Sequence, residues 1–367
     1  MKTVTRPTRT APDPERPQQH RIAPPFVLGG LGILLLIVML VSISFGSISV
    51  PVPTIVQILL NSTGLFHFPV RWDPSLEIII VQVRLPVVVG AVLVGAALAV
   101  AGTLFQGMLR NPLADPYLMG TSSGAALGAT IAFVLPFDTV YGNFFPLTPL
   151  LAFGGAVLTV VFVYAMARSD GRTPVIMLLL AGVVVNAVLT AVQTLILNLW
   201  PSNDFGRLLG LYNWLSGGIA IVGWGPLAVV AIIVLLGLLV AFALASVLDV
   251  FALGEDAAAH LGLHVEWMRF LIVVVASLLT AAAVSISGLI GFVGLVTPHF
   301  MRLLLGPRHR VLLPAAALGG SVFLTLADLL ARTILAPTVI PVGVFTALVG
   351  APFFLFLLRS SKREYKW

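Results

Sequence analysis

The sequence contains no cysteine among its 367 residues, so neither a disulfide framework nor a thiolate metal site is available to the fold. It is also poor in charge, because only 9% of its residues are Asp, Glu, Lys or Arg, against roughly a quarter in an ordinary soluble domain. Apolar residues make up 59% of the chain, and the mean hydropathy is +1.08. This composition predicts an integral membrane protein.

Lysine is confined to the two ends of the chain, at Lys2, Lys362 and Lys366. A P-loop needs a lysine after its glycine-rich turn to hold the phosphates of ATP, so this chain does not hydrolyse ATP by that route. The sequence also lacks histidine and carboxylate pairs at metal-ligand spacing, and it lacks the G-x-S-x-G pattern of a hydrolase nucleophile. We therefore expect no catalytic residues, no metal and no cofactor.

The basic residues give the chain a pI near 10.2, but they are spread over tails and loops and form no continuous stripe that would bind nucleic acid. Membrane topology explains them better. If both basic tails are cytoplasmic, the number of spans is even, and only four of the 20 basic residues lie outside, namely Arg71, Arg84, Arg207 and Arg332. This bias predicts that the N and C termini are both cytoplasmic.

A bilayer core takes a helix of about 20 apolar residues. The run 270–301 is too long for one crossing and is interrupted by Ser287, Gly288 and Gly291, so we predict two helices there, the second of them short. A further span is expected over 312–332. The other apolar runs are 22–70, 85–109, 117–137, 139–167, 173–203, 208–248 and 333–358. The predicted fold is an all-α integral membrane protein of about ten transmembrane helices.

One transmembrane domain is predicted over residues 23–360. The preceding tail, 1–22, is basic, polar and rich in proline, and we expect it to be disordered and cytoplasmic. The first apolar run is longer than the hydrophobic region of a signal peptide, so we interpret it as a retained anchor. A second basic cytoplasmic tail is predicted over 361–367.

Small residues recur at helical spacing in two of the spans. Lipid gives helices little hydrophobic drive to associate, so close contact through small side chains has to hold a bundle together. In the turn between the two spans, Asp115 can cap a helix that begins at Pro116. The small residues are Ala91, Gly95 and Ala99 in one span and Gly120, Gly124 and Gly128 in the next. They predict tight packing and name no function.

The stretch LDVFALGEDAAAHLGLHVEWMRF, residues 248–270, is unusually acidic for this chain. Glu255 and Asp256 fall in the first turn of a predicted short helix, His260 falls in its last turn, and Gly262 can stop it. The helix is too short and too polar to cross a bilayer. It therefore lies at the cytoplasmic end of the bundle.

This acidic segment favours a protein partner over lipid. Surface-lying helices carry Lys or Arg toward the anionic inner leaflet, whereas residues 248–268 contain four acidic residues and no Lys or Arg. A groove on another protein could receive its apolar side chains, and a simple solvated loop is the alternative. The apolar side chains are Leu253, Leu261, Leu263, Val265 and Trp267.

Two polar features lie inside predicted spans. Asn186, Thr190 and Gln193 share one helix face, where they either bond to neighbouring helices or line a pathway. Asp328 and Arg332 are four residues apart and can pair on one face, which favours a structural ion pair. The alternative for Asp328 is proton coupling.

Five stretches together resemble the FecCD-type permeases, the membrane subunits of bacterial ABC importers for ferric siderophores, heme and cobalamin. The resemblance keeps the order of the motifs over about residues 26–360. The stretches are RLPVVVGAVLVGAALAVAGT from Arg84, QGMLRNPLADPY from Gln106 with GTSSGAALGA from Gly120, LIGFVGLVTPHFMRLLLGPRHRV from Leu289, ADLLART from Ala327, and PVGVFTALVGAPFFL from Pro341.

The resemblance implies the type II ABC importer permease architecture in the bacterial cytoplasmic (inner) membrane. It implies a multi-pass chain that contacts lipid and pairs with a second permease subunit, as a homodimer or a heterodimer. Two cytoplasmic ATPase subunits and an extracytoplasmic substrate-binding protein complete the importer, and nucleic acid has no part in it.

By the same resemblance, the segment 250–266 forms the coupling helices that sit in a groove of the ATPase. ATP-driven closure of the ATPase pair would move this segment and switch the access of the pathway. The coupling residues are Leu253, Gly254, Glu255, Asp256, His260, Leu261, Gly262, Leu263 and Val265.

The resemblance also assigns roles at the outer rim and in the pathway. Arg84 and Arg332 match outer positions that attract glutamates of the binding protein, whereas a third family arginine is Val87 here, for which Arg71 or Arg207 compensates. The pathway and its inner gate are assigned to Asn186, Thr190, Gln193 and Thr173.

The leading hypothesis is an importer permease for a ferric siderophore. A heme or cobalamin importer of the same family is the first alternative. A proton-coupled secondary transporter that uses Asp328, or a purely structural scaffold subunit, are the alternatives from other classes.

Overall fold

The computed structural model describes residues 23–46, 48–135, 139–140, 145–169, 171–200, 205–219, 221 and 223–361. The tail predicted over 1–22 lies outside the described residues, and so does the tail predicted over 361–367 except for Ser361. Within the described part, the chain is helical apart from a short antiparallel pair of strands, β1 (Thr139–Val140) and β2 (Phe145–Pro146).

The helices follow the predicted runs. They are α1 (Pro24–Ser44), α2 (Val52–Ser62), α3 (Pro74–Ile78), α4 (Leu85–Leu109), α5 (Thr121–Val134), α6 (Leu147–Ala167), α7 (Val175–Leu199), α8 (Phe205–Leu215), α9 (Gly225–Ala243), α10 (Ala245–Phe251), α11 (Glu255–His260), α12 (Val265–Ser287), α13 (Val293–Leu305), α14 (His309–Thr333) and α15 (Val342–Ser361). A π-helical turn, η1 (Ile79–Arg84), joins α3 to α4, and a 3₁₀ turn, η2 (Pro116–Met119), precedes α5.

Seven segments in the described part of the chain are long and apolar enough to cross a membrane: α1, the continuous α3–η1–α4 segment, α6, α7, α9, α12 and α14. Four shorter apolar helices, α2, α5, α13 and α15, accompany them in the described part of the chain, and three of these, α5, α13 and α15, lie where the sequence predicts the remaining spans. The run 270–301 indeed forms two helices, α12 and the short α13, with the break at Gly288, whose φ is +64°. The predicted all-α membrane fold is confirmed.

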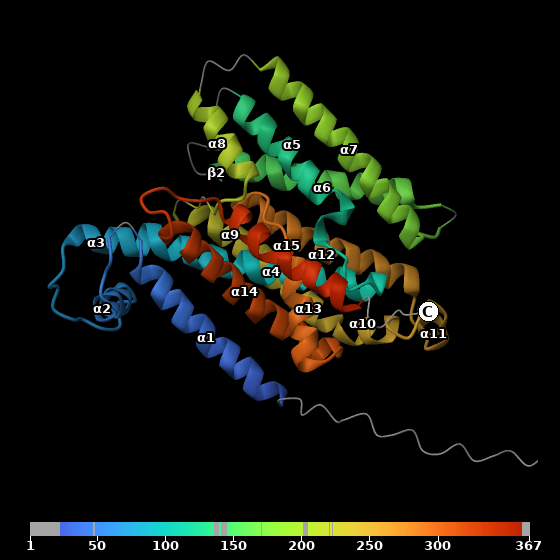
Figure 1. Cartoon of the computed structure of the whole chain (residues 1–367), viewed down its shortest axis with the longest axis horizontal. Helices are drawn as coiled ribbons and strands as arrows, with labels where there is room; N and C mark the ends of the chain where they lie inside the picture. The colour runs from blue at the N-terminus through green and yellow to red at the C-terminus, as the bar shows by residue number, and fades with distance from the viewer. Residues whose placement is uncertain are drawn as a thin grey trace, which may run out of the picture.

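The helix α4 lies at the centre of the fold. It packs against α12, α13 and α14, and most of its side chains are buried. Figure 1 shows α5, α6, α7 and α8 gathered to one side of this core, with α12 contacting both α4 and α6. The helix α1 packs along α14 on the other side.

The small residues predicted to support packing do so through backbone contact. A methyl group on Gly95 would lie 2.3 Å from the carbonyl oxygen of Gly320, and one on Gly102 would lie 1.8 Å from that of Gly294. The second ridge meets α6 in the same way, because a methyl group on Gly128 would lie 2.0 Å from the carbonyl oxygen of Leu151. Only glycine permits these approaches, which replace the missing hydrophobic drive.

The cytoplasmic turn between α4 and α5 is capped as predicted. The Asp115 carboxylate accepts a hydrogen bond of 2.8 Å from the Tyr117 amide, and Pro116 begins the turn. The Tyr117 hydroxyl in turn donates to the Ile290 carbonyl at 2.9 Å and accepts from the Ile290 amide at 3.2 Å. The turn therefore also fixes the break between α12 and α13.

Gly154 and Gly155 provide a matched test of the backbone packing. A methyl group on Gly155 would lie 2.3 Å from the carbonyl oxygen of Gly124, whereas one on Gly154 would meet no atom within 4 Å. We expect Gly155→Ala to lower the free energy of unfolding by about 1–3 kcal/mol. Gly154→Ala should be neutral or stabilising, because alanine is the better helix former. Thermal unfolding in detergent measures both, and equal melting temperatures would contradict the assignment of α5–α6 contact to Gly155.

Candidate functional site

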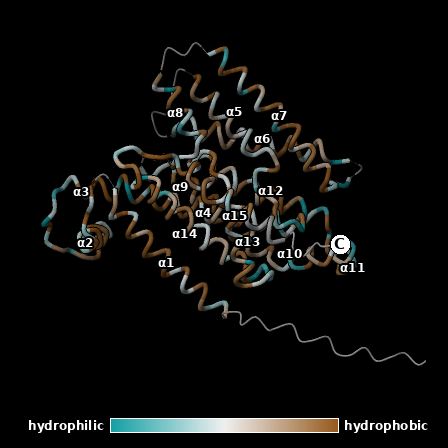
Figure 2. The backbone as a smooth tube through the Cα atoms, in the orientation of Figure 1, coloured by the Kyte–Doolittle hydropathy of each residue, from teal (hydrophilic) through white to brown (hydrophobic). Residues whose placement is uncertain are grey.

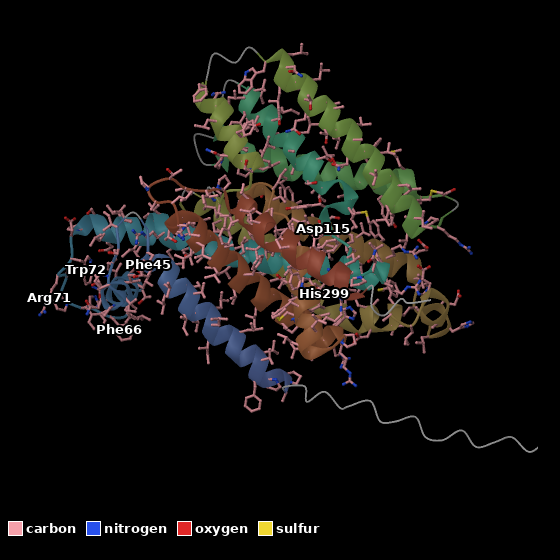
Figure 3. The ribbon with its side chains drawn as sticks, viewed as in Figure 1. Phe45, Phe66, Arg71, Trp72, Asp115 and His299 are labelled. Carbon is pink, nitrogen blue, oxygen red and sulfur yellow. The ribbon has the colours of Figure 1, made fainter. Side chains whose placement is uncertain are left out.

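The apolar bundle ends in two more polar regions (Figure 2). At one end lie α2, α3 and the loop between them, where Figure 3 shows Phe66, Arg71 and Trp72 together with Phe45. At the opposite end lie α10 and α11 (Figure 1). The predicted topology makes the first end extracytoplasmic and the second end cytoplasmic.

The acidic segment forms the predicted short helix. In α11, Glu255 and Asp256 occupy the first turn, where carboxylate charge complements the helix dipole, and His260 occupies the last. Gly254 precedes the helix with a φ of +112°, and Gly262 follows it with a φ of +83°. Both values lie in the left-handed region that favours glycine, so the sequence fixes both ends of this segment.

The apolar side chains predicted to meet a partner divide into two groups. Leu253 and Leu261 are exposed by 68% and 64%, and Trp267 is also exposed. Leu263 and Val265 are only partly exposed, because they pack against the protein's own core. The surface available to a partner is therefore narrower than the sequence suggests, and it combines Leu253 and Leu261 with the acidic side chains of α11.

Arg269 joins three parts of the cytoplasmic end. Its guanidinium is 3% exposed and forms an ion pair of 2.7 Å with Glu255 of α11 through Nη2. Through Nη1 it pairs with Glu266 of its own helix at 2.6 Å and donates to the carbonyl oxygen of Thr173 at 2.8 Å. We call this set of four residues, Glu255, Glu266, Arg269 and Thr173, the arginine clamp.

The clamp forms hydrogen bonds with both the backbone amide and the backbone carbonyl of Thr173. The Thr173 amide donates to Glu266 Oε2 at 3.1 Å, while the Thr173 carbonyl accepts from Arg269. The Thr173 hydroxyl also lies 3.3 Å from the hydroxyl of Tyr164 in α6. Thr173 is directly followed by Pro174, the residue that caps α7. The clamp therefore fixes the point at which α7 begins.

A second connection ties the same end to α14. The Asp249 carboxylate of α10 accepts hydrogen bonds from the His309 amide at 2.9 Å and meets His309 Nδ1 at 2.8 Å. His309 is the first residue of α14 and is buried. The carboxylate thus caps α14 from outside that helix. The elbow formed by α10 and α11 is anchored on one side to α14 and on the other to the start of α7.

The two rim arginines are engaged inside the protein. Arg84 is buried and donates to the carbonyl oxygens of Ile43 at 2.8 Å and Ser44 at 3.3 Å, as well as to that of Ile48. Arg332 pairs with Asp328 at 2.7 Å, with its side chain 19% exposed. The structural ion pair predicted for Asp328 and Arg332 is confirmed, whereas the docking role of both arginines stays a prediction.

Three of the four predicted pathway residues, Asn186, Thr190 and Gln193, lie in α7, and Thr173 lies just before it. Asn186 and Thr190 are exposed on the described surface, and the Thr190 hydroxyl bonds within its own helix at 2.8 Å to the Asn186 carbonyl. Gln193 donates to the Thr130 hydroxyl of α5 at 3.1 Å, so it makes the interhelical bond that was the alternative interpretation. Thr173 is buried and belongs to the clamp.

Another part of α7 borders an apolar cavity of about 650 Å³ between α5, α6 and α7. Its lining has no charged side chain, so it offers no binding groups to a polar cargo. Among the described residues, no group of three or more His, Cys, Asp or Glu side chains is placed to hold a metal ion. The exposed polar face of α7 is therefore the better candidate for the pathway.

The chain belongs to the FecCD transport family, whose model matches residues 34–360. It is 43% identical to the cobalamin import system permease protein BtuC of Halobacterium salinarum over 77% of this chain and 74% of the relative. It is 37% identical to the hemin transport system permease protein HmuU of Yersinia pestis over 94% and 98% of the two chains. The Fe(3+)-citrate import system permease protein YfmE of Bacillus subtilis is 35% identical over 91% and 95%.

A solved structure has the same fold. An inward-facing conformation of a putative metal-chelate type ABC transporter superposes with a TM-score of 0.77 at 33% identity, covering 92% of this chain and 99% of that one. The family, the relatives and the apolar helices together identify this chain as the permease of an ABC importer. It is a multi-pass protein of the inner membrane.

Sequence reasoning assigned Arg269 only to the cytoplasmic side and gave it no role. The one local signal was its spacing of three residues from Glu266, which permits a helical ion pair. The bond to Thr173 joins positions 96 residues apart. Sequence periodicity predicts helix faces, and it cannot predict a contact between residues so far apart in the chain.

The pairing of Arg332 with Asp328 predicts a large effect on stability. Asp328 is 2% exposed, so Arg332→Ala would leave a buried carboxylate without its partner. We expect a loss of about 3–5 kcal/mol in the free energy of unfolding. Replacing both residues by leucine should cost less than this, because no buried charge then stays unpaired. Thermal unfolding compares the variants, and a double variant as unstable as Arg332→Ala would contradict the ion-pair interpretation.

Proposed function

We propose that this chain is the permease subunit of an ATP-driven importer for a ferric siderophore. In this proposal it pairs with a second permease subunit, two ATPase subunits supply the energy, and an extracytoplasmic binding protein delivers the cargo. The observation that carries the proposal is the elbow at the cytoplasmic end, an exposed acidic helix tied directly to the start of a membrane-spanning helix.

The elbow has the properties of a docking element for the ATPase. The helix α11 presents carboxylates at its first turn and the exposed side chains of Leu253 and Leu261 beside it. In a simple solvated loop, the two exposed leucines would gain no stabilisation from their contact with water. A groove on a partner would bury them and gain free energy from the burial. The proposed contact consists of Leu253, Gly254, Glu255, Asp256, His260, Leu261 and Gly262. Leu263 and Val265 hold this segment against the core of the protein.

The proposed pathway runs along the exposed face of α7 and is completed by the second permease subunit. Asn186 and Thr190 supply its polar groups, Gln193 fixes α7 against α5, and Thr173 lies at its cytoplasmic entrance. A face that carries an exposed amide and a hydroxyl offers a bulky chelate more polar contacts than the apolar cavity beside it.

A ferric siderophore is the favoured cargo because relatives named for hemin and for Fe(3+)-citrate both carry an iron complex. Cobalamin import is the second candidate, since a cobalamin permease is 43% identical to this chain. A proton-coupled secondary transporter loses its main support, because Asp328 is held by Arg332 and Arg332 also donates to Ser42 at 2.8 Å.

The energy source is tested in right-side-out membrane vesicles that contain the complete importer and its binding protein. Uptake of radiolabelled iron as a ferric hydroxamate should require ATP inside the vesicles and should persist when a protonophore is added. Unlabelled hemin and cobalamin serve as competitors that report the cargo class. Uptake that ignores ATP depletion but is abolished by the protonophore would contradict the proposal and favour proton coupling through Asp328.

Docking of the binding protein is proposed to depend on positive charge at the outer rim, from Arg84, Arg332 and the exposed Arg71. Since Arg84 and Arg332 also hold the fold, Arg71→Glu is the cleaner test. We expect it to slow association with the loaded binding protein by about threefold or more at low ionic strength.

The salt dependence separates this electrostatic effect from a damaged surface. The screening length falls from about 30 Å at 0.01 M salt to about 8 Å at 0.15 M, so the difference between Arg71→Glu and the wild type should shrink as salt is added. Arg71→Gln should fall between them. Surface plasmon resonance with the permease in nanodiscs measures the association rate, and identical rates for all three proteins would remove Arg71 from the docking surface.

A further inference from the structure

We propose that Arg269 is a positioning residue that transmits movement of α11 to the start of α7, and that its ion pair with Glu255 is the part of this link that the ATPase displaces. The inference rests on the proposed function in one respect, because it takes an ATPase as the source of the movement. The link itself is a property of this chain alone.

The clamp is the direct connection between the elbow and the beginning of α7. The helix α7 packs mainly against α5, α6 and η2, whereas α12 packs mainly against α4, α6 and α9. The hydrogen bonds of Thr173 to Glu266 and Arg269 cross from α12 to the turn that precedes α7. A displacement of α11 thus reaches α7 through the guanidinium of Arg269.

The chemistry of the clamp suits a mechanical link. A guanidinium is a rigid planar fork whose donors keep fixed relative positions, so a shift of one acceptor turns the whole group. Arg269 is 3% exposed, and charge-assisted bonds of this kind are stronger than neutral ones and little weakened by solvent there. Glu255 is half-exposed, with 47% of its side chain accessible. The outer end of the link is therefore open to a partner, while its inner end is enclosed.

The turn also has room to move. A cavity of about 280 Å³ lies directly beside the clamp, lined by Thr173, Glu266, Trp267 and Phe270 and by residues of α6 and the following turn. Closely packed interiors resist displacement, so an adjoining space is what permits Thr173 to shift without unpacking α6 from α12. The structure therefore contains both the residue that transmits the movement, Arg269, and a space into which Thr173 can shift.

Glu255→Gln and Asp256→Asn form the matched pair for a test. Each replaces one carboxylate in the first turn of α11 by its amide. Glu255 pairs with Arg269, whereas Asp256 is exposed and makes no ion pair with any other residue that the structure describes. Any difference between the two variants therefore reports the bond to Arg269 and not the loss of an acidic surface.

The first measurement uses the isolated permease in nanodiscs, without ATPase or cargo. Hydrogen exchange is followed in the peptide that contains the 171–178 amides. We expect Glu255→Gln to accelerate exchange there by about tenfold, a loss of about 1.4 kcal/mol of protection, although Glu255 forms no hydrogen bond or ion pair with this turn among the described residues. Asp256→Asn should match the wild type. Equal exchange in all three proteins would overturn the proposed link.

The second measurement uses the assembled importer in proteoliposomes, with ferric hydroxamate as the probe. The ratio of iron transported to ATP hydrolysed should fall further in Glu255→Gln than in Asp256→Asn, because the ATPase then moves α11 without moving α7. Arg269→Lys should lower the ratio as well, since an ammonium lacks the planar fork that holds three acceptors. Equal ratios for the two carboxylate variants would also overturn the proposal.

The two measurements separate the two inferences. If wild-type complexes show no cargo-dependent ATP hydrolysis, the proposed function fails, and the exchange experiment still decides whether the link exists. If Arg269→Lys does not fold, the comparison of Glu255→Gln with Asp256→Asn alone decides whether α11 is linked to the start of α7.

Discussion

The fold depends on backbone contact through glycine, because lipid on the outside removes the usual drive for helices to bury apolar surface. The helix α4 meets α14 at Gly95 and Gly320, and it meets α13 at Gly102 and Gly294, at distances that leave no space for a side chain. Such contacts make the centre of the bundle rigid. The helix α11 and the turn before α7 lie outside these contacts.

Buried charges complement this steric frame by joining elements that the glycine contacts do not reach. Arg84 binds the carbonyls after α1, Arg332 binds Asp328 and Ser42, and Arg269 binds three acceptors at the cytoplasmic end. Each guanidinium donates to at least two groups within the protein, which offsets part of the cost of removing it from water. The three arginines are retained in the described interior because each one bonds to acceptors on a separate segment of the chain.

The sequence predicted what depends on local pattern. Apolar runs predicted the long helices of the bundle, and the spacing of Glu255, His260 and Gly262 predicted α11. The sidedness that the bias of basic residues indicates stays a prediction. The direction of a side chain and the partner at its end depend on tertiary packing. For this reason the inward orientation of Arg84, the partial burial of Leu263 and Val265, and the bond from Arg269 to Thr173 had no counterpart in the pattern.

The two glycines with positive φ on either side of α11, Gly254 and Gly262, restrict which residues of this segment can change. Gly254 and Gly262 flank this six-residue helix with positive φ angles, so a side chain at either position would strain the backbone. Exposed residues of α11 such as Asp256 and His260 are under no such constraint. The two glycines, and Glu255 with its partner Arg269, are therefore the positions of this segment whose identity the structure restricts.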